Sequence, residues 1–322
     1  MNPNDPPETR RIESRQRKGS VLTRPKLPCL GSFHTINLTA GCPNQCRYCY
    51  AQSYAQHPGW EKIAFYVNAK EKLKQELKRM REAPRLVYFS TASDPFVPAA
   101  PIQNDLYDMM SMLLDCGTAL IISSKCVIQP RFVELFARYP EKVHVQVGIT
   151  TVDDAARRVI EPGAASVGDR LRNLEILAGY RIGREARLDP LVPGLTDTIQ
   201  SVEELFEALG RIRVQTVVTS FLFLRHGIDF PDQLAYRDWS SSAMKRLYTQ
   251  KVDDYCGGGS IWLPSLGYRS ERLACLNALA SRHGMRMLIC RCKNSDDVQS
   301  SCCHPAELAW RATDDDRQLT LF

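Results

Sequence analysis

The feature that most constrains this chain is a short loop with three cysteines, residues 42–49, of sequence Cys-Pro-Asn-Gln-Cys-Arg-Tyr-Cys. Cys42, Cys46 and Cys49 directly follow an alternating apolar run at 34–39, which predicts a β-strand. Three thiols on one loop can converge on one centre, and they are one ligand short of the four thiolates that usually hold an iron–sulfur cluster. A structural zinc site is the alternative, but such sites usually have paired C-x2-C units and four ligands. The spacing therefore favours a cluster in which one iron lacks a protein ligand.

Length and composition indicate an ordinary globular protein. The chain has 322 residues, of which 44% are hydrophobic and 24% charged. We find no run near the ~20 apolar residues that span a bilayer, and the first residues contain no apolar signal core. We therefore expect a cytoplasmic protein that has no membrane segment. Twelve cysteines in a compartment that keeps thiols reduced favour metal or cluster ligation over disulfides.

Strands and helices are expected to alternate through the first two-thirds of the chain. The expected strands are 34–39, 86–90, 119–123, 143–149, 186–188 and 214–224, and the expected helices are 69–82, 103–115, 130–138, 166–178 and 199–210. Several of these strands are near-continuous apolar runs, which predicts an α/β fold with a parallel sheet buried on both faces. An open doubly wound sheet and a partial barrel both fit this periodicity.

The cysteine loop resembles the signature of the radical S-adenosylmethionine (SAM) superfamily. An ordered set of further segments between about residues 20 and 225 resembles the spore photoproduct lyase-like branch: 93–96, 123–125, 149–151, 161–163, 170–171 and 190–194. The resemblance implies a partial (β/α)6 TIM-like barrel, placed at residues 29–228, with its chemistry at the carboxyl ends of the strands. It also implies that SAM binds the open iron of a [4Fe-4S] cluster and is cleaved to a 5′-deoxyadenosyl radical. The electron would come from a donor such as flavodoxin or ferredoxin.

The resemblance also assigns residues to this chemistry. Cys42, Cys46 and Cys49 would hold the cluster, and the cofactor-binding residues would be Tyr48, Asp94, Ser124, Lys125, Thr150 and Arg187. Lys125 supports this assignment independently, because an inward cation at the end of a buried strand needs an anionic partner such as the SAM carboxylate.

The hydrogen donor departs from the family pattern. The lyase of this branch repairs a thymine-dimer lesion in DNA with a hydrogen-donating cysteine three residues before the aspartate of the strand-2 turn. That position is Thr91 here, and a hydroxyl gives up a hydrogen atom poorly. Cys126 is the candidate donor in its place, although a buried structural cysteine is the alternative interpretation.

A cysteine-rich extension is expected at residues 229–310. We predict a helix at 240–254, a strand at 261–263, a helix from Ser270 to His283 and a strand at 285–289. Cys290, Cys292, Cys302 and Cys303, with His304, suggest a second metal centre that holds iron–sulfur or zinc. Because adjacent cysteines cannot easily bind one ion together, Cys256 or Cys275 can take the place of one. The alternative is a cluster of reduced structural cysteines.

The two ends of the chain suggest partners. Residues 1–28 form a basic arm, which would either neutralise phosphates or be a frayed terminus. Residues 311–322 form a tail whose Gln318, Leu319, Leu321 and Phe322 resemble the bacterial sliding-clamp-binding peptide. The alternative is a tail that packs on its own domain.

Together these features predict a lyase-like radical SAM enzyme that repairs a base lesion in DNA and is recruited by the β subunit of the clamp. A radical SAM enzyme that modifies RNA or a peptide, and a non-catalytic iron–sulfur DNA-binding module, are the alternatives.

Overall fold

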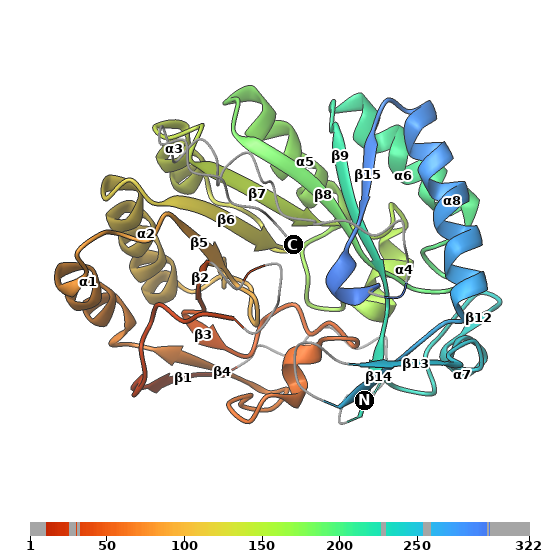
Figure 1. Cartoon of the computed structure of the whole chain (residues 1–322), viewed down its shortest axis with the longest axis horizontal. Coiled ribbons are helices and arrows are strands. Elements are labelled where there is room, and N and C mark those ends of the chain that lie inside the picture. Colours follow the sequence, from red (N-terminus) through yellow and green to blue (C-terminus); the bar gives the residue numbers. More distant parts are fainter. Residues whose placement is uncertain are drawn as a thin grey trace.

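The computed structural model describes residues 11–25, 30, 33–226, 230–253, 259–294 and 296, and it places seven parallel strands in one curved sheet (Figure 1). The strands are β2 (His34–Ile36), β5 (Leu86–Phe89), β6 (Ala119–Ser124), β7 (Val143–Gly148), β8 (Gly183–Leu191), β9 (Thr216–Phe221) and β15 (Arg286–Ile289). Their spatial order is β15-β9-β8-β7-β6-β5-β2. This sheet confirms the predicted α/β fold of the partial-barrel type.

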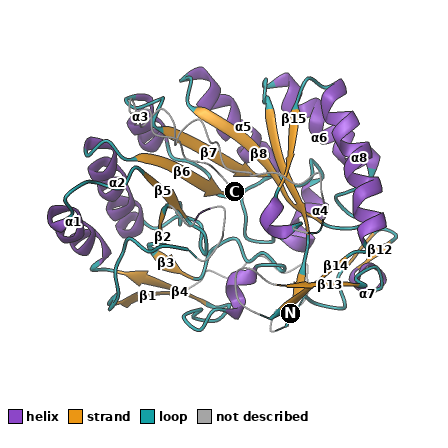
Figure 2. Ribbon diagram, in the orientation of Figure 1, coloured by secondary structure: helices purple, strands orange, loops and turns teal. Residues whose placement is uncertain are grey.

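Helices cover the outer side of the sheet, where α2, α3, α5, α6 and α8 lie in Figure 2. The helices are α1 (Ala69–Arg79), α2 (Ala100–Asp115), α3 (Pro130–Ala137), α4 (Asp154–Ile160), α5 (Val167–Gly179), α6 (Ile199–Arg211), α7 (Ser241–Lys245) and α8 (Leu266–Arg282). Helix α6 shows why they form. Its cap, Thr198, accepts a hydrogen bond from the backbone N–H of Ser201. Its buried side chains then recur at helical spacing: Val202, Leu205, Phe206 and Leu209.

The predicted helix at 240–254 is wrong. Helix α7 ends at Lys245, and strand β13 (Gln250–Asp253) follows. Strand β13 pairs antiparallel with β14 (Ser260–Leu263), and this pairing satisfies the backbone hydrogen bonds of the segment. Local periodicity cannot predict a pairing with another segment. A third strand, β10 (Leu224–Arg225), completes this small sheet, so the predicted long strand at 214–224 is two separate strands.

The last strand of the main sheet comes from the cysteine-rich segment. Strand β15 pairs in parallel with β9, so α8 is the crossover helix between them. Helix α8 begins earlier than predicted, because the cap is Ser265 and not Ser270. The pairing of β15 with β9 brings residues 290–294 to the same carboxyl edge as the other strand ends.

The described part of the basic arm lies against the body of the protein. Strand β1 (Arg11–Arg15) pairs with β4 (Lys62–Tyr66), which also pairs with β3 (Thr39–Ala40). The buried residues Val21 and Leu22 donate backbone hydrogen bonds to the Glu76 carboxylate. The exposed basic residues in this stretch are Arg11, Arg15, Lys18 and Arg24.

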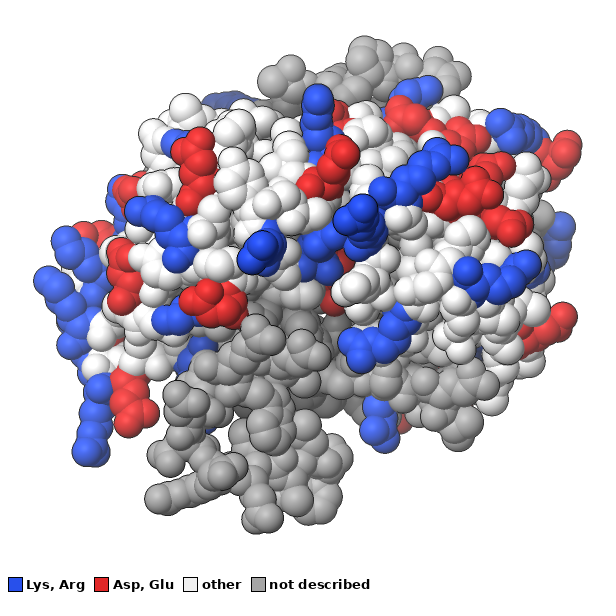
Figure 3. Space-filling model, turned by 90° about the horizontal axis from the view of Figure 1, so that it is seen from above, with Lys and Arg blue, Asp and Glu red and all other residues white. Residues whose placement is uncertain are grey.

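On the face seen from above in Figure 3, basic and acidic side chains are interspersed. A separate two-stranded sheet consists of β11 (Ala235–Tyr236) and β12 (Trp239–Ser240). None of the helices in the described ranges is both long enough and apolar enough to span a membrane.

Candidate active site

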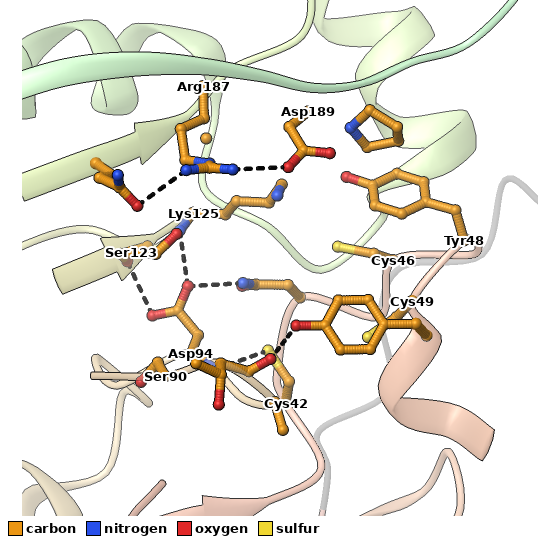
Figure 4. A pocket seen from close by; sticks show the side chains of 18 of the residues that line it. Cys42, Cys46, Tyr48, Cys49, Ser90, Asp94, Ser123, Lys125, Arg187 and Asp189 are labelled. Atoms are coloured by element: carbon orange, nitrogen blue, oxygen red, sulfur yellow. Dashed lines mark hydrogen bonds and ion pairs between the residues drawn. The ribbon is translucent and has the colours of Figure 1, made fainter. Parts of the chain in front are cut away.

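A pocket lies at the carboxyl edge of the main sheet, between the cysteine loop and the ends of the central strands (Figure 4). Carboxyl ends of parallel strands meet at one edge, which brings together residues far apart in sequence. The predicted site residues that line the pocket are Cys42, Cys46, Cys49, Tyr48, Asp94, Ser124, Lys125, Arg187 and Cys290.

The three cysteines of the loop form one wall of the pocket. Gly41 begins the loop with a φ of +78°, and a Cβ there would lie 2.7 Å from the Lys62 carbonyl oxygen, so this position requires glycine. Across the residues that the structure describes, no three Cys, His, Asp or Glu side chains approach closely enough to hold a single ion. Cys42, Cys46 and Cys49 all line the pocket, and thiolates are the usual protein ligands of an iron–sulfur cluster.

The cysteine wall is electrostatically unfavourable for bare thiolates. Burial raises the pKa of Cys46 to about 12, and the nearby Glu161 carboxylate adds to the rise. Burial also raises the pKa of Cys42, with a further contribution from Asp94. Since metal ligation needs thiolates, the positive charge of the iron must stabilise them. The donor set therefore fits a cluster ligand role and not a free nucleophilic cysteine.

Asp94 connects the cysteine loop to the end of β6. Its carboxylate accepts hydrogen bonds from the Ser124 hydroxyl at 2.8 Å and from the Asn44 amide at 2.9 Å. The backbone N–H of Lys125 donates to it at 2.7 Å. The backbone N–H of Asp94 in turn donates to Cys42 Sγ at 3.4 Å. Because its oxygens are used within the protein, Asp94 is suited to hold the wall in place, and its N–H is suited to tune a cluster bound to Cys42.

Tyr48 and Lys125 lie next to this wall. The Lys125 ammonium is 5.8 Å from the centre of the Tyr48 ring and 4.0 Å from Glu161 Oε1. Gly148 leaves room for the lysine side chain, because a Cβ at this glycine would lie 2.8 Å from Lys125 Cγ. At 4.0 Å the lysine and the glutamate are an ion pair without a direct hydrogen bond, so the ammonium can donate to an anionic group in the pocket.

The opposite wall carries a buried ion-pair network. Arg187 and Asp189 lie across the pocket from Asp94 and Cys42 in Figure 4. Arg187 donates to Asp189 at 3.0 Å, and the Lys293 ammonium binds both Asp189 oxygens at 2.7 and 2.6 Å. The Ser220 hydroxyl donates to Asp189 at 2.7 Å.

Charge balance on this wall favours ligand groups that accept hydrogen bonds. Burial raises the pKa of Asp189, but Lys293 and Arg187 outweigh it, and the net effect is a lowered pKa. Burial lowers the pKa of Lys293, but Asp189 outweighs this effect and the pKa is raised. Asp189 and Lys293 are therefore both charged near neutral pH. The Lys293 ammonium and the Arg187 guanidinium share the Asp189 carboxylate, and Arg187 also donates to the Gln146 side-chain oxygen at 3.1 Å, so this wall is rich in cationic donors.

Two predicted residues lie behind the pocket. Cys126 is buried, does not line the pocket and donates from Sγ to Asn44 Oδ1 at 3.1 Å. This position argues against the predicted hydrogen-donor role, because a donor must reach the substrate. Thr150 is also buried outside the lining, whereas Thr91 does line the pocket.

The predicted second metal centre is described only in part. Cys290 is buried and lines the pocket at the end of β15. The backbone of Cys292 lies in the short helix η3 (Arg291–Lys293). Cys302, Cys303 and the tail residues Gln318, Leu319, Leu321 and Phe322 lie outside the described residues. The metal centre and the clamp peptide therefore stay predictions.

Sequence reasoning missed Lys293 and Phe223 as pocket residues. Lys293 follows a predicted strand closely, as Lys125 does, and this is the signal that could have identified it. Its use would have required knowing that β15 belongs to the main sheet. Phe223 follows β9, and its ring centre is 6.0 Å from Lys293 Nζ and 5.9 Å from the Arg225 guanidinium carbon.

Relatives and solved structures share parts of this chain. A radical SAM Nα-GlyT isomerase of Pseudomonas phage M6 is 25% identical over 182 residues, which cover 56% of this chain and 37% of the isomerase. An uncharacterized protein of Mycobacterium tuberculosis is 23% identical over 247 residues, or 74% of this chain and 70% of that protein. The chain thus spans little more than a third of the phage relative.

The fold is similar to that of spore photoproduct lyase. Its complex with dinucleoside spore photoproduct has a TM-score of 0.64 at 15% identity and covers 87% of this chain and 82% of the lyase. A variant with bound AdoMet and the same dinucleoside has a TM-score of 0.65 at 15% identity, over 86% and 81% of the two chains.

The family model of the radical SAM superfamily matches residues 36–209, more than half of the chain. This match includes the cysteine loop and most strands of the sheet. The chain therefore belongs to the radical SAM superfamily.

Proposed function

We propose that this radical SAM enzyme acts on DNA, at a base lesion, and that the sliding clamp recruits it. The observation that carries the DNA assignment is the shared fold, over 87% of the chain, with a lyase solved in complex with a dinucleoside ligand. The pocket supports it, because donor side chains face the cysteine wall across a space at the carboxyl edge of the sheet.

The cysteine wall, from here on called the first wall, and the side chains next to it would hold the cofactors. With the cluster and SAM bound, the site would supply radical abstraction of hydrogen from the substrate. Cys42, Cys46 and Cys49 would hold the cluster, and Lys125 would pair with the SAM carboxylate. Asp94 would fix the position of the loop, and Tyr48 would contact SAM.

The residues of the opposite wall, from here on called the second wall, hold the substrate. Lys293 donates to carbonyl or phosphate oxygens of the target nucleotide, and so does Arg187, in place of the cofactor-binding role that the sequence resemblance implies for it. Tyr50 and Phe223, with ring centres 6.4 Å apart, both line the pocket and offer apolar surface to a base. A target inside a duplex would have to be extruded to reach this depth.

DNA binding should depend on salt through the exposed basic residues of the arm. Each phosphate contact contributes about −0.9 to the slope of log affinity against log salt for a duplex. We expect Lys18→Gln with Arg24→Gln to reduce the slope by about 1.8. An unchanged slope would show that these residues do not contact DNA.

The decisive experiment is a SAM cleavage assay after anaerobic reconstitution, with lesion-bearing DNA, undamaged DNA and RNA as substrates. We expect 5′-deoxyadenosine in every reduced sample and loss of the lesion, followed by chromatography and mass analysis of the digested DNA, only from lesion-bearing DNA. Product from RNA alone would replace the DNA proposal, and no 5′-deoxyadenosine at all would support the non-catalytic module.

Recruitment is tested by a clamp pull-down that compares the full chain with one lacking residues 318–322. We expect recovery only with the full chain, and equal recovery would remove the clamp from the proposal.

Iron, zinc and sulfide analysis of Cys292→Ala and Cys302→Ala chains tests the second metal centre. Contents equal to those of the unsubstituted chain would show that this centre does not exist.

A further inference from the structure

The segment 160–163, which carries the Glu-Pro-Gly motif, docks directly on the cysteine loop. The backbone N–H of Arg47 donates to the Ile160 carbonyl at 2.9 Å, and the N–H of Gly163 donates to the Asn44 carbonyl at 3.0 Å. A Cβ at Gly163 would overlap the Pro43 carbonyl oxygen, so this close approach requires glycine. Two backbone hydrogen bonds and the close packing of Gly163 therefore fix the motif against the loop that holds the predicted cluster ligands.

Glu161 is the charged centre of this docking segment. It is fully buried, and its Oε2 pairs with Arg170 Nη1 at 2.6 Å. The Tyr48 hydroxyl donates to its Oε1. Arg170 is also buried and donates to the backbone carbonyls of Gly148 and Ala165, both at 2.9 Å. The carboxylate thus links the tyrosine of the cysteine loop to a guanidinium anchored on the barrel.

Glu161 also faces Lys125, whose ammonium is 4.0 Å from Oε1. Burial raises the pKa of Glu161, but Arg170 and Lys125 outweigh it and the pKa is lowered. One oxygen of an ionised carboxylate therefore faces both side chains that the family resemblance assigns to SAM.

Glu161 itself does not line the pocket, whereas Tyr48 and Lys125 do. It stands behind them and touches one by a hydrogen bond and the other by charge. A buried Glu–Arg pair is weak evidence for stability alone, since such pairs are often replaceable by apolar groups. The orientation of this carboxylate toward two pocket residues from different elements indicates a role in the site.

We propose that Glu161 is a positioning residue for SAM: it holds the Tyr48 hydroxyl and the Lys125 ammonium in the arrangement that accepts the cofactor. The proposal depends on membership of the radical SAM superfamily and not on the DNA substrate. Its failure is therefore distinguishable from failure of the proposed function.

The main test is Tyr48→Phe, which removes only the hydroxyl that contacts Glu161 and keeps both the ring and the Glu161–Arg170 pair. We expect normal iron content and an unchanged circular dichroism spectrum, with SAM affinity weakened about tenfold, because a hydrogen bond to a charged group is lost. The readouts are equilibrium dialysis of SAM with the reconstituted protein and the change in the cluster's electron paramagnetic resonance spectrum on SAM addition. Tyr180→Phe, at an exposed tyrosine, is the matched control.

The second test is Glu161→Gln, which keeps the shape and removes the charge. Because this variant leaves Arg170 buried without its partner, folding must be checked first, and Glu175→Gln on exposed α5 surface is its control. We expect SAM affinity in the Tyr48→Phe/Glu161→Gln double variant to equal that of Glu161→Gln, since the Tyr48 hydroxyl acts only through the charge of Glu161. If Glu161→Gln does not fold, Tyr48→Phe still decides the proposal.

Two results would overturn the proposal. One is a SAM affinity and spectral response of Tyr48→Phe that match those of the unsubstituted protein. The other is a double variant whose loss of affinity is the product of the two single losses, which would show that the residues act independently.

Discussion

The two walls of the pocket are built in different ways. The cysteine wall is a single short loop, residues 42–49, held by local turns and by neighbours that dock on it, such as Asp94 and Gly163. The opposite wall is assembled by the sheet, which brings Asp189 on β8 next to Lys293 after β15, more than a hundred residues later. The loop can be recognised from its sequence, whereas the residues of the second wall come together only when the strands pair in the folded sheet.

This difference implies a division of roles. Cys42, Cys46 and Cys49 of the cysteine wall lie within residues 36–209, which match the radical SAM superfamily model. Lys293 of the second wall lies outside this match. We therefore expect substitutions in the first wall to affect the cluster and SAM, and substitutions in the second to affect the substrate.

The largest effect is expected from Cys46→Ala. Loss of one of three thiolates leaves the cluster with two protein ligands, so iron content should fall to background and SAM cleavage should cease. Iron analysis and the 5′-deoxyadenosine assay measure both. Cys116→Ala, at an exposed cysteine outside the pocket, should retain iron and activity. Full iron content in Cys46→Ala would show that the wall does not hold a cluster.

Gly163→Ala should damage the same wall by steric overlap. The new methyl group would meet the Pro43 carbonyl oxygen, so the cysteine loop must move. We expect the free energy of unfolding, measured by urea denaturation, to fall by about 3 kcal/mol. We also expect iron analysis to show a reduced iron content. A Cβ at Gly179 meets nothing within 4 Å, and Gly179→Ala should cost no stability. Equal stability and iron content in the two variants would contradict the tight docking of the motif.

Lys293→Met should weaken the second wall and spare the first. Asp189 keeps Arg187 and Ser220, so we expect a loss of about 2 kcal/mol in the free energy of unfolding. DNA binding should weaken, while iron content and SAM affinity stay unchanged. Lys142→Met, remote from the pocket lining, is the control. A loss of SAM affinity in Lys293→Met would place the cofactor, and not the substrate, at this wall.

The stability difference between the unsubstituted protein and Lys293→Met should depend on pH. Lys293 has a raised pKa, so its contribution is complete below 10.5 and is lost as pH rises through its folded-state pKa. Asp189 has a lowered pKa, so its contribution is complete above 3.8 and fades in more acidic solution. Urea denaturation should therefore give a constant difference between about pH 5 and 9 and a smaller one at either extreme. A difference that changed steadily across neutral pH would contradict the ion pair.

The same contrast explains what the sequence could predict. Periodicity and resemblance located the first six strands of the main sheet, because buried parallel strands are near-continuous apolar runs. They also identified the cysteine loop and the pocket residues Lys125 and Arg187. They misassigned 240–254, since the strand there depends on pairing with β14, and they did not place β15 in the main sheet. Pairing between distant segments has no local signature, and for this reason Lys293 was not anticipated.

The smallest effect concerns α8, the helix that precedes β15 and Lys293 of the second wall. Ser265, and not the predicted Ser270, caps α8 by accepting a hydrogen bond from the backbone N–H of Tyr268 at 3.3 Å. Ser265→Ala should lower the free energy of unfolding by about 1 kcal/mol, whereas Ser270→Ala within the helix should change it little. Because α8 packs beside β15 and not on the cysteine loop, iron content and SAM affinity should be unchanged in both variants. Urea denaturation and iron analysis of the pair test this separation, and a loss of iron in Ser265→Ala would show that the two walls do not behave independently.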